Sequence, residues 1–463
     1  MSRPGSGASS DSSIERRMGS FGKSTALTLG TSVIGFLIAL GTSVILARVL
    51  GPEARGEFAL VFVLPALIAN LTGLGIGPAT TFHVARGKFR REDILGGSLL
   101  LAAGASVLGL AVGLVCVLFY RESIVPGVSG RHLAAGLAFI PLSRFFLVGR
   151  SILFGERRFL AYNGTALLSG VVSLLLLALV LLVFRQGVTA AVLVRLAGPA
   201  AAILALVMIL ARTGGVRFAA NTAYLRKVVA YGGKVFLGNA IGFLNYRLDL
   251  LLLNAYLSPL TVGFYAIAVG LAERLWVLSQ AASSVLFPTV AAEADTEKHS
   301  ITPIVCRTVL LVTAIGAGVL LAICRWMIVL LYSDAYLPSV PALRILLVGI
   351  VALSVGRVLA NDLAGRGKVM FNVYVGAAAL VTNVSLNLLL IPRLHLLGAA
   401  WATAASYSLA LALQLVFYCR ETGESPLTIL VPRPSDVRLF WRLMSIGASK
   451  LCRMLGGRLR RPT

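Results

Sequence analysis

The sequence predicts an all-α polytopic membrane protein with about 12 transmembrane helices in two parallel six-helix bundles. Its composition, its apolar stretches and an internal repeat lead to this fold class. Hydrophobic residues make up 58% of the 463 residues and charged residues only 13%, which is about half the share of roughly 25% that is usual in a soluble domain. Such a chain has too little polar sequence to cover a soluble core and is too hydrophobic to be disordered.

The net charge of +24 is typical of proteins that bind nucleic acid. A nucleic-acid binder, however, carries its basic residues on a polar, solvated face, and this composition cannot supply one. We therefore expect no nucleic-acid partner and attribute the charge to basic loops beside a membrane.

Each predicted span is a run of roughly 20 apolar residues, the length that crosses the hydrocarbon core of a bilayer. Strands of a membrane barrel alternate apolar and polar residues, whereas residues 173–184 are almost continuously apolar. Helical spans are therefore predicted, near residues 24–49, 58–79, 94–118, 133–154, 162–184, 189–211, 232–257, 260–289, 304–332, 341–361, 369–391 and 397–419.

The distribution of basic residues predicts the orientation, because cytoplasmic loops are enriched in Lys and Arg. If both termini are cytoplasmic, 27 of the 42 Lys and Arg residues lie in cytoplasmic segments and six lie in the opposite loops. We therefore expect a multi-pass protein of the plasma membrane with both termini in the cytoplasm.

The spans divide the chain into five parts. The first part is Ser/Gly-rich and the last mixes apolar residues at helical spacing with Arg and Lys, which fits either a basic amphipathic helix on the anionic leaflet or an unstructured basic tail. The parts are a disordered cytoplasmic N-terminus (1–23), an N-terminal six-helix bundle (24–211), a basic cytoplasmic linker (212–231), a C-terminal six-helix bundle (232–419) and a basic amphipathic cytoplasmic tail (420–463).

An internal repeat relates the two bundles. Residues 34–37 (IGFL) recur at 241–244, and residues 148–150 (VGR) recur at 355–357, both at an offset of 207 residues. Six spans separate the copies, so the halves have the same orientation, as in transporters whose substrate site lies between two parallel repeats. The same offset pairs Leu50 with Leu257, Pro52 with Pro259, Gly56 with Gly263 and Ala59 with Ala266.

The sequence gives little support to an enzyme or to a metal site. Its four histidines are scattered, and its five cysteines include no CxxC pair, so neither residue type has the spacing of metal ligands. The glycine-rich run 73–77 lacks the Lys and Ser/Thr of a phosphate-binding loop. We interpret it as close helix packing or as a flexible break in the second span.

Ionisable residues inside spans are the candidate functional groups, because they are costly in hydrocarbon unless they face a cavity or a partner. In the seventh span Asn245 and Asp249 share a helical face and Arg247 points away, so either that helix is broken or one charge is structural. For each arginine the alternative is a structural role such as snorkelling, which we favour for Arg195. The candidate cavity residues are Arg48, Arg144, Asn245, Arg247, Asp249, Glu273, Arg274, Gln280 and Arg357.

Arginines outnumber carboxylates among these buried groups. Guanidinium groups bind phosphate bidentately, so the inventory favours an anionic passenger.

Several segments resemble the polysaccharide transporter family of the multidrug/oligosaccharidyl-lipid/polysaccharide exporter superfamily. The resemblance covers most of residues 24–420 and begins with the signature ARVLGPE (47–53), followed by GEFAL (56–60). Further similar segments are 246–252, 262–268, 286–288, 387–392 and 398–403.

The resemblance implies a flippase of lipid-linked (undecaprenyl-pyrophosphate) oligosaccharides in the bacterial inner membrane. It implies alternating access through a cationic central cavity, coupling to an H⁺ or Na⁺ gradient or to the membrane potential, and no cofactor. The partners to be expected are the lipid-linked oligosaccharide, anionic lipids and glycan polymerase or assembly proteins. The alternatives are a multidrug antiporter of the same superfamily, a lipid II flippase, which usually has fourteen spans, and a non-transporting scaffold.

Overall fold

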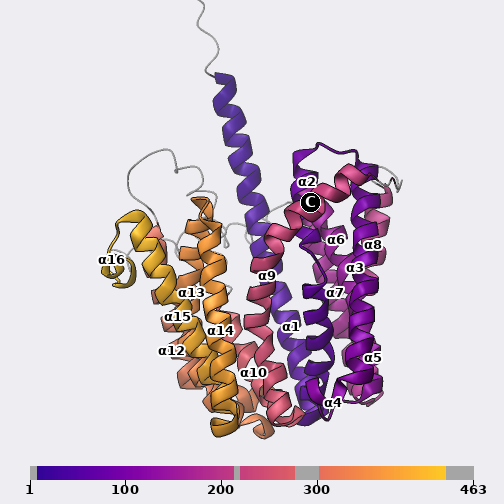
Figure 1. Cartoon of the computed structure of the whole chain (residues 1–463), viewed down its shortest axis with the longest axis vertical. Helices are drawn as coiled ribbons and strands as arrows, with labels where there is room; N and C mark the ends of the chain where they lie inside the picture. Colours follow the sequence, from indigo (N-terminus) through magenta and orange to yellow (C-terminus); the bar gives the residue numbers. More distant parts are fainter. Residues whose placement is uncertain (1–7, 213–218, 220, 277–301, 434–463) are drawn as a thin grey trace, which may run out of the picture. The chain divides into compact units, whose positions relative to one another are not determined.

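The computed structural model describes residues 8–212, 219, 221–276 and 302–433. These residues form helices joined by short connections and contain no strand (Figure 1). Ten helical segments among them are long and apolar enough to cross a membrane. The chain is therefore an all-α polytopic membrane protein, as the sequence predicts.

The first predicted span and the start of the second form one long helix, α1 (Ala8–Leu71), with a kink at Gly51. Gly51 has a φ of 76°, which side chains other than glycine rarely adopt, and Pro52 after it has no N–H to donate. We expected residues 1–23 to be disordered, but α1 already begins at Ala8. A helix that is nucleated in the apolar span extends at little cost into flanking polar residues.

The chain divides into two compact units. Unit 1 comprises Met1–Ala266 and Val329–Tyr336, and unit 2 comprises Ile267–Ile328 and Leu337–Thr463. After α1, unit 1 contains α2 (Ile76–Arg86), α3 (Arg91–Phe119), α4 (Arg121–Ile124), α5 (Gly130–Leu137), α6 (Phe139–Gly155), α7 (Phe159–Ala178) with the π-helical turn η1 (Leu179–Val183), α8 (Val188–Arg212), α9 (Thr222–Tyr256) and the 3₁₀ turn η3 (Asp334–Tyr336).

Two helices run from one unit into the other, namely α10 (Pro259–Ala272) and α12 (Thr302–Tyr332). The eighth predicted span, 260–289, is described only as far as Trp276, and Gln280 lies outside the described residues. The other helices of unit 2 are η2 (Glu273–Leu275), α13 (Ser339–Gly365), α14 (Val369–Leu394), α15 (Leu396–Thr422) and α16 (Pro426–Leu430). All twelve predicted ranges thus lie on helix over most of their described residues, with interruptions at 72–75 in the second range and at Ala138 in the fourth.

The compact units are not divided at the linker 212–231, where we placed the boundary between the bundles. The seventh span, α9, belongs to unit 1 because its backbone packs directly on the segment before α2. A Cβ added at Gly75 would overlap the carbonyl of Gly232, and one added at Gly232 would overlap the carbonyl of Leu74. Only glycines permit so close an approach.

The repeat also appears as a reciprocal contact inside unit 1. A Cβ added at Gly56 would overlap the carbonyl oxygen of Pro259, and one added at Gly263 would overlap that of Pro52. These are the residue pairs that the 207-residue offset relates, so sequence repeats lie against each other around a local two-fold.

The fourth and tenth spans, α6 and α13, end in the same way in their separate units. Arg157 (φ 57°) follows α6 and Gly367 (φ 79°) follows α13. After α6, the amide of Arg158 donates to the carbonyl oxygen of Leu153 at 2.9 Å, and after α13, the amide of Lys368 donates to that of Leu363 at 2.8 Å. This is the hydrogen bond of a left-handed helix cap.

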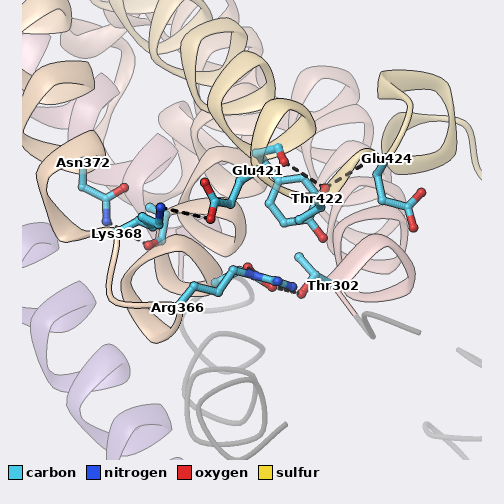
Figure 2. A network of polar contacts seen from close by, with 10 residues as sticks. Thr302, Arg366, Lys368, Asn372, Glu421, Thr422 and Glu424 are labelled. Atoms are coloured by element: carbon cyan, nitrogen blue, oxygen red, sulfur yellow. Dashed lines mark hydrogen bonds and ion pairs between the residues drawn. The ribbon is translucent and has the colours of Figure 1, made fainter. Parts of the chain in front are cut away.

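A hydrogen bond and an ion pair connect helix ends of unit 2 (Figure 2). The buried carboxylate of Asp362 on α13 accepts from Thr302 of α12 and from Arg366. Lys368 reaches Glu421 at the end of α15 at 3.2 Å. These contacts lie where the sequence places the cytoplasmic ends of the spans.

Candidate functional site

Unit 1 contains a cavity of about 450 Å³ between α1, α2, α6, α7, α8 and α9. Three arginines and no carboxylate line it within the described part of the chain. Aromatic side chains, among them Phe139, Phe236 and Phe243, form much of the rest. The polar side chains on the wall are Asn70, Ser143, Arg144, Arg150, Ser169, Arg195 and Asn239.

The second span is broken at the edge of this cavity. Helix α1 ends at Leu71 and α2 begins at Ile76, and between them Leu74 and Gly75 have φ values of 45° and 64°. Both φ values lie in the left-handed region, which interrupts a right-handed helix. The glycine-rich run therefore interrupts the second span, which is one of the two interpretations that the sequence allowed.

Arg144 on α6 lies against this break. Its side chain is buried, and its Nη2 donates 3.0 Å to the Oγ1 of Thr72. A Cβ added at Gly73 would overlap the guanidinium group. Glycine at this position is therefore what lets Arg144 occupy the space beside the broken backbone.

The other two arginines of the cavity lie against aromatic rings. The Arg150 guanidinium carbon is 3.9 Å from the ring centroid of Tyr162, and that of Arg195 is 5.9 Å from the centroid of Phe62. Such cation–π contacts orient a guanidinium group without neutralising its charge. No ion pair involves either arginine within the part of the chain that the structure describes.

Among the predicted site residues that the structure describes, Arg144 alone lines this cavity. Arg48 is exposed and donates to main-chain carbonyls at the end of α12, with its Nε 2.9 Å from the oxygen of Leu331 and its Nη2 bonded to that of Leu330.

Three of the predicted residues lie on α9, which is continuous through this region. Asn245 and Asp249 are buried on one face, and Asp249 accepts 2.8 Å from the hydroxyl of Tyr265. Arg247 is half-buried, and its Nη1 donates 3.4 Å to the carbonyl of Tyr246. The helix is therefore not broken at this point, which leaves the alternative that one of the two charges is structural.

The remaining described candidates are in unit 2. Glu273 and Arg274 are on η2, and Arg357 of α13 lies over the ring of Trp276, with its guanidinium carbon 4.1 Å from the centroid. The structure thus brings Arg357 close to the η2 turn. No cluster of three His, Cys, Asp or Glu side chains that could hold a metal occurs in the residues that the structure describes.

A family profile described as polysaccharide biosynthesis protein matches residues 45–362, which is more than half of the chain. The chain belongs to this polysaccharide biosynthesis protein family. No curated protein sequence matches it.

The fold of this polysaccharide biosynthesis protein is similar to that of solved membrane transporters. The lipid II flippase MurJ in an inward closed conformation aligns with a TM-score of 0.72 and 13% identity, over 93% of this chain and 99% of MurJ. An inward-facing multidrug resistance MATE family transporter of the MOP superfamily aligns with a TM-score of 0.69 and 17% identity, over 84% of this chain and 94% of that one.

A MOP superfamily transporter from Pyrococcus furiosus, described with a binding pocket of reverse polarity, has a TM-score of 0.60 and 17% identity, over 86% of this chain and 94% of that one. At these identities the likeness shows the fold alone.

Sequence reasoning missed most of the cavity wall of this family member. Arg150 was not among the candidate residues predicted from the sequence, and Arg195 was interpreted as structural, yet both line the cavity with Arg144. The signal that could have located the site is the run 73–77, because a helix break inside a span needs polar partners nearby.

Proposed function

We propose that this protein is a flippase for lipid-linked oligosaccharides, built on an undecaprenyl-pyrophosphate carrier, in the bacterial inner membrane. It moves them across the membrane by alternating access during polysaccharide biosynthesis. Family membership and the transporter fold support a transport role in polysaccharide synthesis.

The observation that carries the proposal is the charge of the cavity in unit 1. Arg144, Arg150 and Arg195 line it without a carboxylate among the described residues. A partly enclosed, low-dielectric space with unneutralised guanidinium groups favours an anion, and pyrophosphate is the anionic group of the proposed carrier lipid. The phenylalanines on the wall would contact sugar or prenyl carbons.

The same observation speaks against a multidrug antiporter. A carrier of cationic compounds needs carboxylates in its cavity, and the described wall has none. A lipid II flippase remains the second candidate, favoured by the TM-score of 0.72 to MurJ, and its substrate would present the same pyrophosphate.

In the proposed arrangement both termini face the cytoplasm and the basic loops contact anionic lipids. Transport would be driven by an H⁺ or Na⁺ gradient, and glycan polymerase or assembly proteins would receive the product. The protein would need no cofactor and perform no chemistry on its passenger.

The proposal is tested by deleting the gene and extracting the lipid-linked oligosaccharides from inverted and right-side-out membrane vesicles. We expect the intermediate to accumulate on the cytoplasmic face. The wild-type gene should restore its export, and an Arg150→Ala/Arg195→Ala double variant should not.

The exposed Arg131, outside the cavity, supplies the control, and Arg131→Ala should export normally. If no oligosaccharide accumulates in the deletion strain, the flippase proposal is wrong. If lipid II accumulates instead, the second candidate replaces it.

A further inference from the structure

We propose that the break in the second span and Arg144 together form a binding subsite for a phosphate group of the passenger. This inference rests on the proposed function and assigns one part of the cavity wall to one chemical group. Its components are the N-terminus of α2, the residues 72–75 and the guanidinium group of Arg144.

The N-terminus of α2 supplies an amide donor at the cavity. Gly75, Ile76, Gly77 and Pro78 line the wall, and the first amides of a helix have no acceptor in its own preceding turn. The Ile76 amide bonds to Gly73 at 3.0 Å and the Ala79 amide to Gly75 at 3.2 Å. Pro78 has no amide proton, so Gly77 is the first-turn donor left for a ligand.

Arg144 is the second, independent observation. It is only 5% exposed, and its Nε has no hydrogen-bond partner among the described residues. Its only hydrogen bond within the described residues is to the neutral hydroxyl of Thr72. A buried guanidinium group is normally fully hydrogen-bonded, so an unsatisfied N–H of such a group beside a cavity indicates a binding site for a ligand.

The electrostatics of this arrangement point to an anion. The N-terminus of a helix carries a partial positive charge of about half an elementary charge, and Arg144 brings a full positive charge to the same place. Two positive groups beside each other in a low-dielectric site repel one another unless an anion lies between them. Phosphate satisfies both, because it accepts from backbone amides and from a guanidinium fork.

Arg144 differs from the other arginines of the cavity in its contacts with aromatic rings. Arg150 stacks on Tyr162 and Arg195 lies over Phe62, so aromatic faces already fix their positions. Arg144, which lies beside the helix break, has no aromatic ring over its guanidinium group in the part of the chain that the structure describes. We therefore assign the binding of the phosphate group beside α2 to Arg144, and the binding of the rest of the passenger to the other two arginines.

The test measures binding to the purified full-length protein in detergent, by calorimetry or by ligand-dependent thermal stabilisation. The probes are farnesyl diphosphate, farnesol and inorganic pyrophosphate. We expect farnesyl diphosphate to bind, farnesol to bind far more weakly, and pyrophosphate to compete with farnesyl diphosphate.

Three variants at two positions, Arg144 and Gly73, test the subsite. Arg144→Ala should weaken binding of farnesyl diphosphate about tenfold or more, and Arg144→Lys should weaken it less, because lysine keeps the charge without the bidentate fork. Gly73→Ala should weaken binding like Arg144→Ala although every charge remains, because the added Cβ displaces the flexible end of Arg144.

The matched control is Gly104→Ala, since a Cβ at Gly104 meets nothing within 4 Å. This variant should bind like wild type. Size-exclusion profiles establish that each variant is folded.

The subsite is refuted if folded Arg144→Ala and Gly73→Ala bind farnesyl diphosphate with wild-type affinity, even if the protein exports oligosaccharide. It is also refuted if farnesol binds as tightly as farnesyl diphosphate. Competition by pyrophosphate without any advantage of the prenyl chain would mean that the site takes free phosphate compounds. The proposed function would then fail while the subsite stands.

Discussion

Arg48 binds a helix end, although it lies within a segment that resembles a transporter signature. Its guanidinium group donates to the carbonyls of Leu330 and Leu331, which belong to the last turn of α12 and have no acceptor role within that helix. A cation at the C-terminal end of a helix also interacts favourably with the helix dipole. The contact ties α1 to the end of α12 within unit 1.

We predict that Arg48→Ala lowers the free energy of unfolding by about 1 kcal/mol. The protein should still bind farnesyl diphosphate like wild type, because Arg48 does not line the cavity. Thermal denaturation in detergent measures the first effect, and calorimetry measures the second. An unchanged denaturation midpoint with lost binding would instead place Arg48 in the passenger's path.

His83 near the end of α2 lies in an aromatic cluster outside the long apolar segments. Its ring contacts the rings of Phe82, Phe89, Tyr224 and Tyr231, at centroid distances of 5.2, 5.6, 5.9 and 6.3 Å. Burial lowers the pKa of His83 from its ordinary value, and the charges of Lys227 and Arg86 lower it further, against a hydrogen bond with the backbone of Lys227 that raises it.

This direction predicts a loss of stability in acid. Below the ordinary histidine pKa of about 6.5 the unfolded chain binds a proton at His83 and the folded chain does not. The free energy of unfolding therefore decreases as the pH is lowered. Denaturation midpoints at about pH 7.5 and pH 5.5 should differ more for wild type than for His83→Phe, which keeps an aromatic ring but cannot titrate. Equal differences in both proteins would show that His83 does not contribute.

At the scale of helices, the repeat-related glycines Gly56 and Gly263 determine how closely α1 and α10 approach. Each glycine faces the carbonyl of the proline that begins the other segment, as in the small-residue contacts that let membrane helices pack backbone to backbone. The contact needs both glycines at once, because it is reciprocal.

We predict that Gly56→Ala and Gly263→Ala each destabilise the protein by about 1–3 kcal/mol, because the added methyl group overlaps backbone atoms that cannot rotate away. The repeat supplies a matched control pair. A Cβ at Gly35 or at Gly242 meets nothing within 4 Å, so Gly35→Ala and Gly242→Ala should not destabilise the protein and can stabilise it through the better helix propensity of alanine. Equal effects at both pairs, measured by thermal denaturation, would contradict the reciprocal contact.

The helices themselves could be predicted because apolar length and helical conformation are linked in a membrane-spanning chain. The break inside the second span was harder to place, whereas Gly51 lies between the first two predicted spans. The run 73–75 combines glycine with apolar neighbours, and glycine in a membrane helix indicates close packing as often as a break. Only the positive φ angles and the position of Arg144 distinguish these roles.

The cavity residues were predictable as a class but not as a set. Intramembrane arginines stand out in the sequence, yet whether a guanidinium group faces a cavity, a helix end or an aromatic ring depends on which helices pack together. Arg144, Arg48 and Arg357 illustrate these three outcomes. No spacing rule within a single helix could have separated them.

At the scale of the whole molecule, charge has two roles. Most of the 42 Lys and Arg residues are in predicted cytoplasmic segments, where they orient the chain in the membrane. A few guanidinium groups in unit 1 instead line the cavity. We propose that this small set, and not the overall positive charge, recognises the passenger.

The most direct measurement of this central claim is transport in proteoliposomes. The purified protein is reconstituted with a fluorescent undecaprenyl-pyrophosphate-linked oligosaccharide, and a membrane-impermeant quencher reports how much of it has crossed. The account predicts movement by the wild-type protein, normal movement by Arg131→Ala and little movement by the Arg150→Ala/Arg195→Ala variant. Equal movement by the cavity variant and the wild type, or no movement by the wild type under an imposed ion gradient, would contradict it.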